Sequence, residues 1–191
     1  ASRGLTNVLV LSGDYPVAGY QGVSRPVFDV DSVCMLRMLR DMNQGLRVPG
    51  RKKGGSLLLD KTGFFCGACV SPFKQLPSEL AGQYLKMERK IREGASFLIT
   101  QVGYDARKWD ELKQYIDQKQ LSVPLIGYVY LLNRGVARVF HRGMIPGCVV
   151  SDALLEKVEH YAGGPDRGKA FCREFAAKQV AILKGMGYRG A

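Results

Sequence analysis

A glycine and a carboxylate directly after an apolar run form the first candidate for ligand chemistry. The run Asn7 to Leu11 is followed by Ser12, Gly13 and Asp14. A glycine at the end of a buried strand lets a ligand approach the backbone closely, and an aspartate there can hydrogen-bond a ring N–H or hold a cation. The alternative is a simple turn in which the aspartate caps the backbone. The residues alone leave both interpretations open.

A threonine and a glutamine after a second apolar run form the next candidate. Thr100 and Gln101 follow the run Phe97 to Ile99. A glutamine on a buried strand is costly to leave unpaired, and its amide can pair with both a donor and an acceptor of a heterocycle. The alternative is that Gln101 already lies beyond the strand and is solvated. A third polar pair, Asn133-Arg134, follows a later apolar run, and its loop-like composition favours a solvated position.

Three cations at helical spacing are suited to a pair of phosphates. Lys86, Arg89 and Lys90 lie three and four residues apart, on one face of a helix predicted over residues 78–93. The alternative is an ordinary solvated face of charges. The net charge of +11 favours anionic partners, which include nucleic acid, a dinucleotide pyrophosphate and a polyglutamylated cofactor. Charge alone does not choose among them.

The cysteines favour core thiols over a metal or redox site. Cys66 and Cys69 have the CxxC spacing, but no second such pair is present, and His141 and His160 lie far along the chain. Cysteines three apart on a strand point to opposite faces and cannot chelate together. We therefore predict no metal site. The odd total of five cysteines fits reduced thiols in a cytoplasmic protein better than a disulfide framework.

The elements that must position these residues alternate along the chain. Runs of β-branched and leucine residues alternate with segments whose apolar residues recur at helical spacing. This alternation predicts right-handed βαβ crossovers and a parallel sheet, either open or rolled into a barrel. The predicted strands are residues 7–11, 64–70, 97–101 and 125–131, with a further candidate at 188, and the predicted helices are residues 31–43, 78–93, 105–118, 152–161 and 166–184.

Length and apolar content predict one domain. A chain of 191 residues with 46% hydrophobic residues can build one sizeable core and is short for two. Its apolar runs fall far short of the roughly 20 residues that cross a bilayer, so we predict no membrane partner. The chain starts at Ala1 without an initiator methionine and enters a strand almost at once, which indicates a cut chain.

A basic, glycine-rich connection from Gly45 to Gly63 is predicted to leave the core. Its Arg51 to Lys53 cluster could contact RNA, but it lacks interleaved aromatic residues and a recognisable binding module. The favoured interpretation is a loop that is solvated or lies beside a cofactor. An RNA-binding α/β domain stays open as a hypothesis for the whole chain.

Three segments together resemble methylenetetrahydrofolate reductases in order and approximate spacing. They are residues 7–14 (NVLVLSGD), 89–101 (RKIREGASFLITQ) and 123–127 (VPLIG). The resemblance covers nearly the whole chain and implies an α/β fold of the TIM (β/α)8 barrel type. It further implies that this chain enters the barrel at the fourth strand, so that residues 1–191 form a single partial barrel domain that binds FAD and folate.

The resemblance also implies roles for individual residues. Asp14 would lie beside the flavin and the folate as the catalytic residue of this chain. Gln101, with Thr100, would contact the folate and the nicotinamide. The positions that match the family's FAD-binding residues are Ser12, Gly13, Asp14, Phe28, Asp29, Gln83, Lys86, Arg89 and Lys90.

The implied reaction is hydride transfer from NAD(P)H to FAD and then to 5,10-methylenetetrahydrofolate, which gives 5-methyltetrahydrofolate. The family's general-acid glutamate lies on a first strand that this chain does not contain, and Cys66 to Pro72 replaces an expected tyrosine and histidine. The alternative is therefore a non-catalytic flavin- and folate-binding subunit that completes a methyl-transfer complex. We expect a homo-oligomer or a complex with another subunit.

Overall fold

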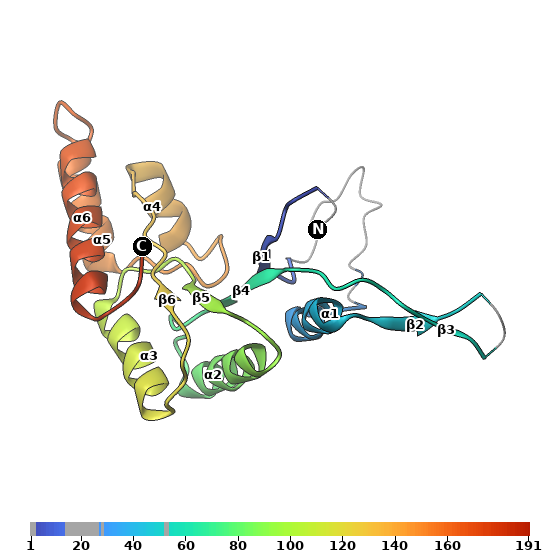
Figure 1. The fold of residues 1–191 in the computed structure, drawn as a ribbon. Helices are drawn as coiled ribbons and strands as arrows, with labels where there is room; N and C mark the ends of the chain where they lie inside the picture. The colour runs from blue at the N-terminus through green and yellow to red at the C-terminus, as the bar shows by residue number, and fades with distance from the viewer. Residues whose placement is uncertain (1–2, 14–26, 28, 52–53) are drawn as a thin grey trace. The chain divides into compact units, whose positions relative to one another are not determined.

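The computed structural model describes residues 3–13, 27, 29–51 and 54–191. The chain divides into two compact units, residues 1–69 with 85–97 and residues 70–84 with 98–191. The boundary passes through strand β4 (Phe65–Val70), helix α2 (Pro77–Arg92) and strand β5 (Phe97–Thr100), which Figure 1 labels. The single domain expected from the chain length stays a prediction.

A parallel strand pair forms the centre of the first unit. Strand β1 (Asn7–Val10) pairs with β4 so that Asn7 lies opposite Phe65 and Val10 opposite Ala68. Helix α1 (Ser32–Gln44) contacts β1 and buries Leu36 and Leu39. Both strands and the helix begin within one residue of their predicted starts.

The side chain of Asp31 caps the start of α1. The Asp31 carboxylate accepts hydrogen bonds from the backbone N–H groups of Val33 and Cys34, at 3.0 and 2.9 Å. These two N–H groups have no partner within the helix, so the cap satisfies them and fixes where the helix starts.

The basic connection contains a hairpin that the sequence analysis did not predict. Strands β2 (Arg47–Pro49) and β3 (Ser56–Leu58) pair antiparallel, with Val48 opposite Leu57. All three residues of β3 are exposed. The hairpin is held by backbone hydrogen bonds and buries few side chains. Its sequence therefore has no regular pattern of apolar residues from which to predict it.

A βαβ unit forms the centre of the second unit. Strand β5 pairs in parallel with β6 (Leu125–Ile126), with Leu98 opposite Leu125. Helix α3 (Ala106–Gln118) connects the two strands, as predicted, and buries Trp109, Leu112 and Ile116. Parallel strands need such a crossover, and a helix is its usual form.

Strand β6 is shorter than the predicted 125–131. The backbone beyond it is held by other bonds, because Gly127 N donates to Gly190 O at 2.9 Å and Tyr128 N donates to the Thr100 hydroxyl at 3.0 Å. The further strand expected at Tyr188 is a single parallel bridge between Ile126 and Gly190.

Three helices complete the second unit: α4 (Arg134–His141), α5 (Asp152–Ala162) and α6 (Lys169–Gly185). Helix α5 packs on α4 and on α6, and α3 also packs on α6. Helix α4 was not predicted. Asn133 is exposed, as expected, and it is also the N-cap of this helix, because its amide oxygen accepts from Val136 N at 3.0 Å. None of the helices in the described ranges is long and apolar enough to cross a bilayer.

The second unit has its own hydrophobic core. The core joins the residues after β5, the residues before and within α4, and the inner faces of α5 and α6. Its buried members are Val102, Leu132, Ala137, Phe140, Cys148, Val150, Leu154, Val158 and Cys172.

We expect the substitution Gly103→Ala to lower the free energy of unfolding by about 1–3 kcal/mol, because it overpacks the core. A Cβ atom on Gly103 would lie 2.3 Å from ring carbons of Phe73, which is only 5% exposed and packs edge-on against Trp109. Urea denaturation of the variant and the unchanged protein measures the difference.

Gly82→Ala is the matched control for this substitution. Gly82 is exposed on α2, and no atom lies within 4 Å of the position its Cβ would take. Alanine there should raise helix stability by about 0.5–1 kcal/mol. Equal stability of the Gly103→Ala variant and the unchanged protein would show that Phe73 is not fixed in this position.

Candidate functional site

One backbone hydrogen bond aligns two strand ends in the second unit. Gln101 N, just past β5, donates to Val70 O, the last residue of β4, at 2.8 Å. The residues that follow each strand are thereby brought side by side. In parallel α/β folds the carboxyl ends of the strands carry the ligand site, so this is the place to look for one.

Thr100 is buried and holds two strand ends together. Its hydroxyl accepts the hydrogen bond from Tyr128 N, which ties the chain beyond β6 to the end of β5. Its side chain is 1% exposed in this arrangement. The contact with substrate predicted for Thr100 stays a prediction.

Gln101 has one half of its amide hydrogen-bonded and the other half without a partner among the described residues. Its Oε1 accepts a hydrogen bond from Val102 N at 3.1 Å, while within the described part of the chain its Nε2 has no hydrogen-bond partner. The side chain is half-buried and lies just beyond the strand, between the two alternatives that the sequence allowed. An amide with one free donor group at a strand end can recognise an acceptor on a heterocycle.

Two further residues, Ser71 and Gly147, frame Gln101. A Cβ on Gly147 would lie 3.4 Å from Gln101 Nε2 and 3.7 Å from Ser71 Oγ, and the backbone of Gly147 has φ +79°, which favours glycine. Ser71 Oγ is buried and has no hydrogen-bond partner among the residues described. A buried hydroxyl without a partner is rare enough to suggest that something else satisfies it.

Neither of these two residues was predicted to belong to the site. Ser71 directly follows β4, as Gln101 directly follows β5, so the same positional argument could have found it. The approach of Gly147 to Gln101 depends on tertiary structure, so no local signal in the sequence marks it.

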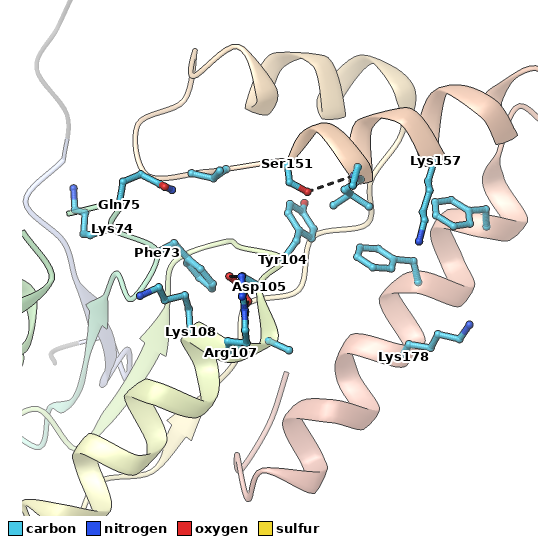
Figure 2. Close-up of a pocket in the computed structure, with 16 residues that line it drawn as sticks. Phe73, Lys74, Gln75, Tyr104, Asp105, Arg107, Lys108, Ser151, Lys157 and Lys178 are labelled. Atoms are coloured by element: carbon cyan, nitrogen blue, oxygen red, sulfur yellow. Dashed lines mark hydrogen bonds and ion pairs between the residues drawn. The ribbon is translucent and has the colours of Figure 1, made fainter. Parts of the chain in front are cut away.

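The second unit also contains a cavity of about 790 Å³. The loops after β4 and β5, the start of α5 and one side of α6 line it (Figure 2). That volume lies within the range of small-molecule sites. Its walls combine aromatic rings with cations, namely Phe73, Tyr104, Phe171 and Phe175 together with Lys74, Arg107, Lys108, Lys157 and Lys178.

In the first unit, two of the three cations predicted to bind phosphate are already engaged. Lys90 Nζ donates to Cys69 O at 2.6 Å, near the carboxyl end of β4, and Lys86 Nζ lies 3.3 Å from the Asp31 carboxylate. Arg89 is exposed on the same helix. The pKa of Lys90 is lowered, first by burial and then by the nearby charge of Lys86. The two ammonium groups therefore act on each other electrostatically.

The remaining predicted cofactor residues are placed as follows. Ser12, Gly13 and Asp29 are exposed in the first unit, the first two directly after β1. Gln83 is half-buried on the part of α2 that belongs to the second unit. Asp14 and Phe28 lie outside the described residues, so their predicted roles stay predictions.

The cysteines of β4 lie in a poor environment for metal chemistry. Burial raises the pKa of both Cys66 and Cys69, which keeps the thiols protonated near neutral pH. Among the described residues, no group of three or more histidine, cysteine, aspartate or glutamate side chains is placed to hold a metal ion.

Parallel strand pairs joined by helices, with polar residues gathered at the strand ends, define this chain as an α/β protein of the kind that binds ligands at the carboxyl edge of its strands. The profile of the family described as methylenetetrahydrofolate reductase matches residues 1–189. The chain belongs to the methylenetetrahydrofolate reductase family, as the sequence predicted. This family has the TIM-barrel fold, so the predicted fold class is also confirmed.

Other comparisons give weaker matches. A search of curated proteins finds no significant match to this chain. Among solved structures, the chain is similar to one described as an uncharacterized protein from Clostridium thermocellum that binds two copies of 5-methyl-5,6,7,8-tetrahydrofolic acid, with a TM-score of 0.46 and 15% sequence identity. The match covers 68% of this chain and 46% of that chain, so the chain spans less than half the length of that protein.

We expect Lys90 to titrate below the ordinary range of lysine. Reductive ¹³C-methylation followed by NMR over pH measures this pKa, and Lys90→Arg assigns the resonance. Because the folded pKa lies below the unfolded one, the unfolded chain binds more protons between the two values, and stability should rise with pH across that window. A Lys90 resonance that titrates at the ordinary value would contradict the burial of this ammonium group.

Proposed function

We propose that this chain is the flavin- and folate-binding portion of a methylenetetrahydrofolate reductase-like oxidoreductase. The reaction would pass hydride from NAD(P)H through FAD to 5,10-methylenetetrahydrofolate and give 5-methyltetrahydrofolate. The family match over residues 1–189 supports the reaction class. The observation that carries the substrate side is Gln101, whose Nε2 has no partner among the described residues and lies beside Ser71 and Gly147.

Gln101 would hold the pterin ring of the folate. The amide Nε2 donates to a ring acceptor, and Ser71 Oγ can donate or accept beside it. Val102 N fixes the orientation of the amide by donating to Oε1, so the free donor group is presented to the ligand without rearrangement. Thr100 would act indirectly, because its hydroxyl holds the chain after β6 against the end of β5.

The residues of the first unit fit the phosphates of FAD. An ammonium group has three N–H donors, and Lys90 donates one of them to Cys69 O, so two remain. Lys86 is held only by a half-exposed ion pair with Asp31, which a phosphate can replace at little cost. Arg89 is exposed and can form a bidentate contact. When bound, FAD supplies the hydride chemistry, and the protein positions it.

Asp14 completes the proposal as the residue beside the flavin and the folate. It follows the exposed pair Ser12 and Gly13 at the end of β1, where the backbone is open to a flat ring. NAD(P)H would serve as the co-substrate that reduces the flavin.

Flavin uptake tests the cofactor side. We expect the purified protein to bind FAD, to show a flavin absorbance band and to oxidise NADH with menadione as acceptor. Replacing both Lys86 and Arg89 by glutamine should weaken FAD binding about tenfold, since two charge-assisted contacts are lost. Lys184→Gln, on the exposed end of α6, is the control that also removes positive charge.

The outcomes of this assay distinguish the reductase from a non-catalytic binding subunit and from an RNA-binding protein. Flavin colour without NADH oxidation would favour the non-catalytic binding subunit. A protein that takes up no flavin and is retained on RNA in a salt-sensitive manner would contradict the proposal.

Gln101→Ala tests the substrate side without requiring turnover. We expect the affinity for 5-methyltetrahydrofolate, measured by calorimetry, to fall about tenfold, because the ring loses one hydrogen-bond donor. Gln118→Ala changes an exposed glutamine at the end of α3 and should leave the affinity unchanged. Equal affinity of the Gln101→Ala variant and the unchanged protein would remove Gln101 from the site.

A further inference from the structure

The hairpin of β2 and β3 has one apolar face. Val48 lies opposite Leu57 in the ladder, and Leu59 N donates to Leu46 O at 2.9 Å, which makes Leu46 and Leu59 the next pair. Partners across two strands point to the same side of a sheet, and so do residues two apart on one strand. These four side chains therefore share a face. Leu57 is 56% exposed and Leu59 is 41% exposed, so this face is open to solvent.

The hairpin lies outside the core of the first unit. Among the described elements that lie wholly in that unit, β2 and β3 contact each other but neither α1 nor β1. Figure 1 shows the two strands as a separate ribbon. A two-stranded hairpin is at best marginally stable alone in water, and an exposed apolar strand invites unwanted association. The exposure of this element therefore points to a role.

The base of the hairpin is held in place by Asn43 at the end of α1. Its Oδ1 accepts hydrogen bonds from Phe64 N and from the Thr62 hydroxyl, and its Nδ2 donates to Phe64 O, each at 2.8 Å. Thr62 N also donates to Met42 O at 3.1 Å. These bonds join the chain that enters the hairpin to the chain that leaves it. They fix the position of an element that itself buries few side chains.

The hairpin and its flanks are strongly basic. Residues 45–63 contain five lysine or arginine residues and one aspartate. Arg51 in the turn and Lys61 after β3 are exposed, and neither has an acidic partner within the described part of the chain. Arg47, Arg51 and Ser56 line a shallow hollow at the turn together with glycine backbone. Guanidinium and hydroxyl groups can donate hydrogen bonds to phosphate. The element therefore joins an open apolar face to uncompensated positive charge.

An anionic lipid surface matches both of these properties. The apolar face carries only four side chains, whereas a stable interface between proteins takes about 20–30 residues from each side. A bilayer needs no shape-matched partner, because apolar side chains enter its fluid boundary and cations pair with its headgroups. Nucleic acid would use the cations and leave the leucines exposed. A second copy of this chain would bring like charges together.

We propose that the hairpin of β2 and β3 attaches this protein to an anionic lipid surface. Leu57 and Leu59 enter the boundary between headgroups and acyl chains, and Arg51 pairs with lipid phosphates. The expectation of no membrane partner came from the lack of runs long enough to cross a bilayer, which a surface contact does not need. The inference goes beyond the proposed reaction, since the hairpin carries none of the residues proposed to hold flavin or folate.

Vesicle flotation with the full chain tests this attachment. Vesicles of phosphatidylcholine that contain about one third phosphatidylglycerol are compared with vesicles of phosphatidylcholine alone. We expect the anionic vesicles to bind the protein at least about tenfold more tightly, since each cation near an anionic surface contributes about fivefold. The difference should shrink as salt is added, because the cations are exposed to solvent.

Leu57→Thr and Leu58→Thr form a matched pair of variants. The two leucines are 56% and 59% exposed on the same strand, but Leu58 lies opposite Arg47 and so points to the other face. Leu57→Thr should weaken binding to anionic vesicles about tenfold, because it removes an apolar contact. Leu58→Thr should change that binding by no more than about twofold. Threonine is favoured in strands, so circular dichroism and thermal unfolding of both variants should match the unchanged protein.

Arg51→Gln tests the contribution of charge. It should weaken binding to anionic vesicles about fivefold and leave binding to phosphatidylcholine vesicles unchanged. Lys184→Gln, on the exposed end of α6, removes the same charge elsewhere and should leave both affinities unchanged.

No binding to anionic vesicles, or equal losses for Leu57→Thr and Leu58→Thr, would overturn the inference. Retention on RNA that depends on Arg51 and not on Leu57, in a protein that does not bind vesicles, would assign the hairpin to nucleic acid instead. A dimer that Leu57→Thr dissociates, again without vesicle binding, would assign the apolar face to a second copy. The assay needs neither flavin nor folate, so loss of flavin uptake with intact vesicle binding would reject only the proposed reaction.

Discussion

The hydrogen bond from Gln101 N to Val70 O is the interaction on which the candidate site depends. It is a backbone bond of the parallel ladder, so it exists because two apolar segments are buried side by side and must pair their polar groups. It sets the register in which the loops after β4 and β5 meet. Ser71 and Gln101 are therefore neighbours, although neither side chain bonds the other, and the loops that continue from them reach the cavity already fixed at one end.

Positive charge is arranged differently in the two units. In the first, Lys90 is half-buried against a backbone carbonyl and close to Lys86, so the charges are held in fixed positions at a cost that an anion would relieve. In the second, Lys74 and Lys157 stand on solvated elements around aromatic rings. The first arrangement is the one for which we propose the phosphates of FAD. The overall charge of +11 could not distinguish them, because it carries no information on spacing or burial.

Capping residues and apolar runs were sufficient to predict the helices and strands that depend on neighbouring residues in the sequence. Asp31 marks the start of α1 because a helix N-terminus needs an acceptor. The apolar runs mark β4 and β5 because these parallel strands are largely buried. The run at β1 also marks a strand, but of its four residues only Val10 is fully buried, so the burial expected there was wrong. Helix α4 escaped prediction because it is short, and its Asn133 cap resembles a loop residue. The hairpin of β2 and β3 buries little and so leaves no apolar period. The cavity and the role of Gly147 could not be predicted, because both depend on contacts between loops and helices that are distant in sequence. The strand-end rule located Gln101 and could have located Ser71.

The central claim is that the end of β5 recognises the pterin ring of a folate through the free amide group of Gln101. The most direct measurement is the ¹⁵N NMR signal of the Gln101 side-chain amide during titration with 5-methyltetrahydrofolate, assigned with Gln101→Glu. A saturable shift of this signal is expected, because the Nε2 atom gains an acceptor that the described part of the protein does not provide. Saturable binding that moves other signals and leaves the Gln101 amide unchanged would contradict it.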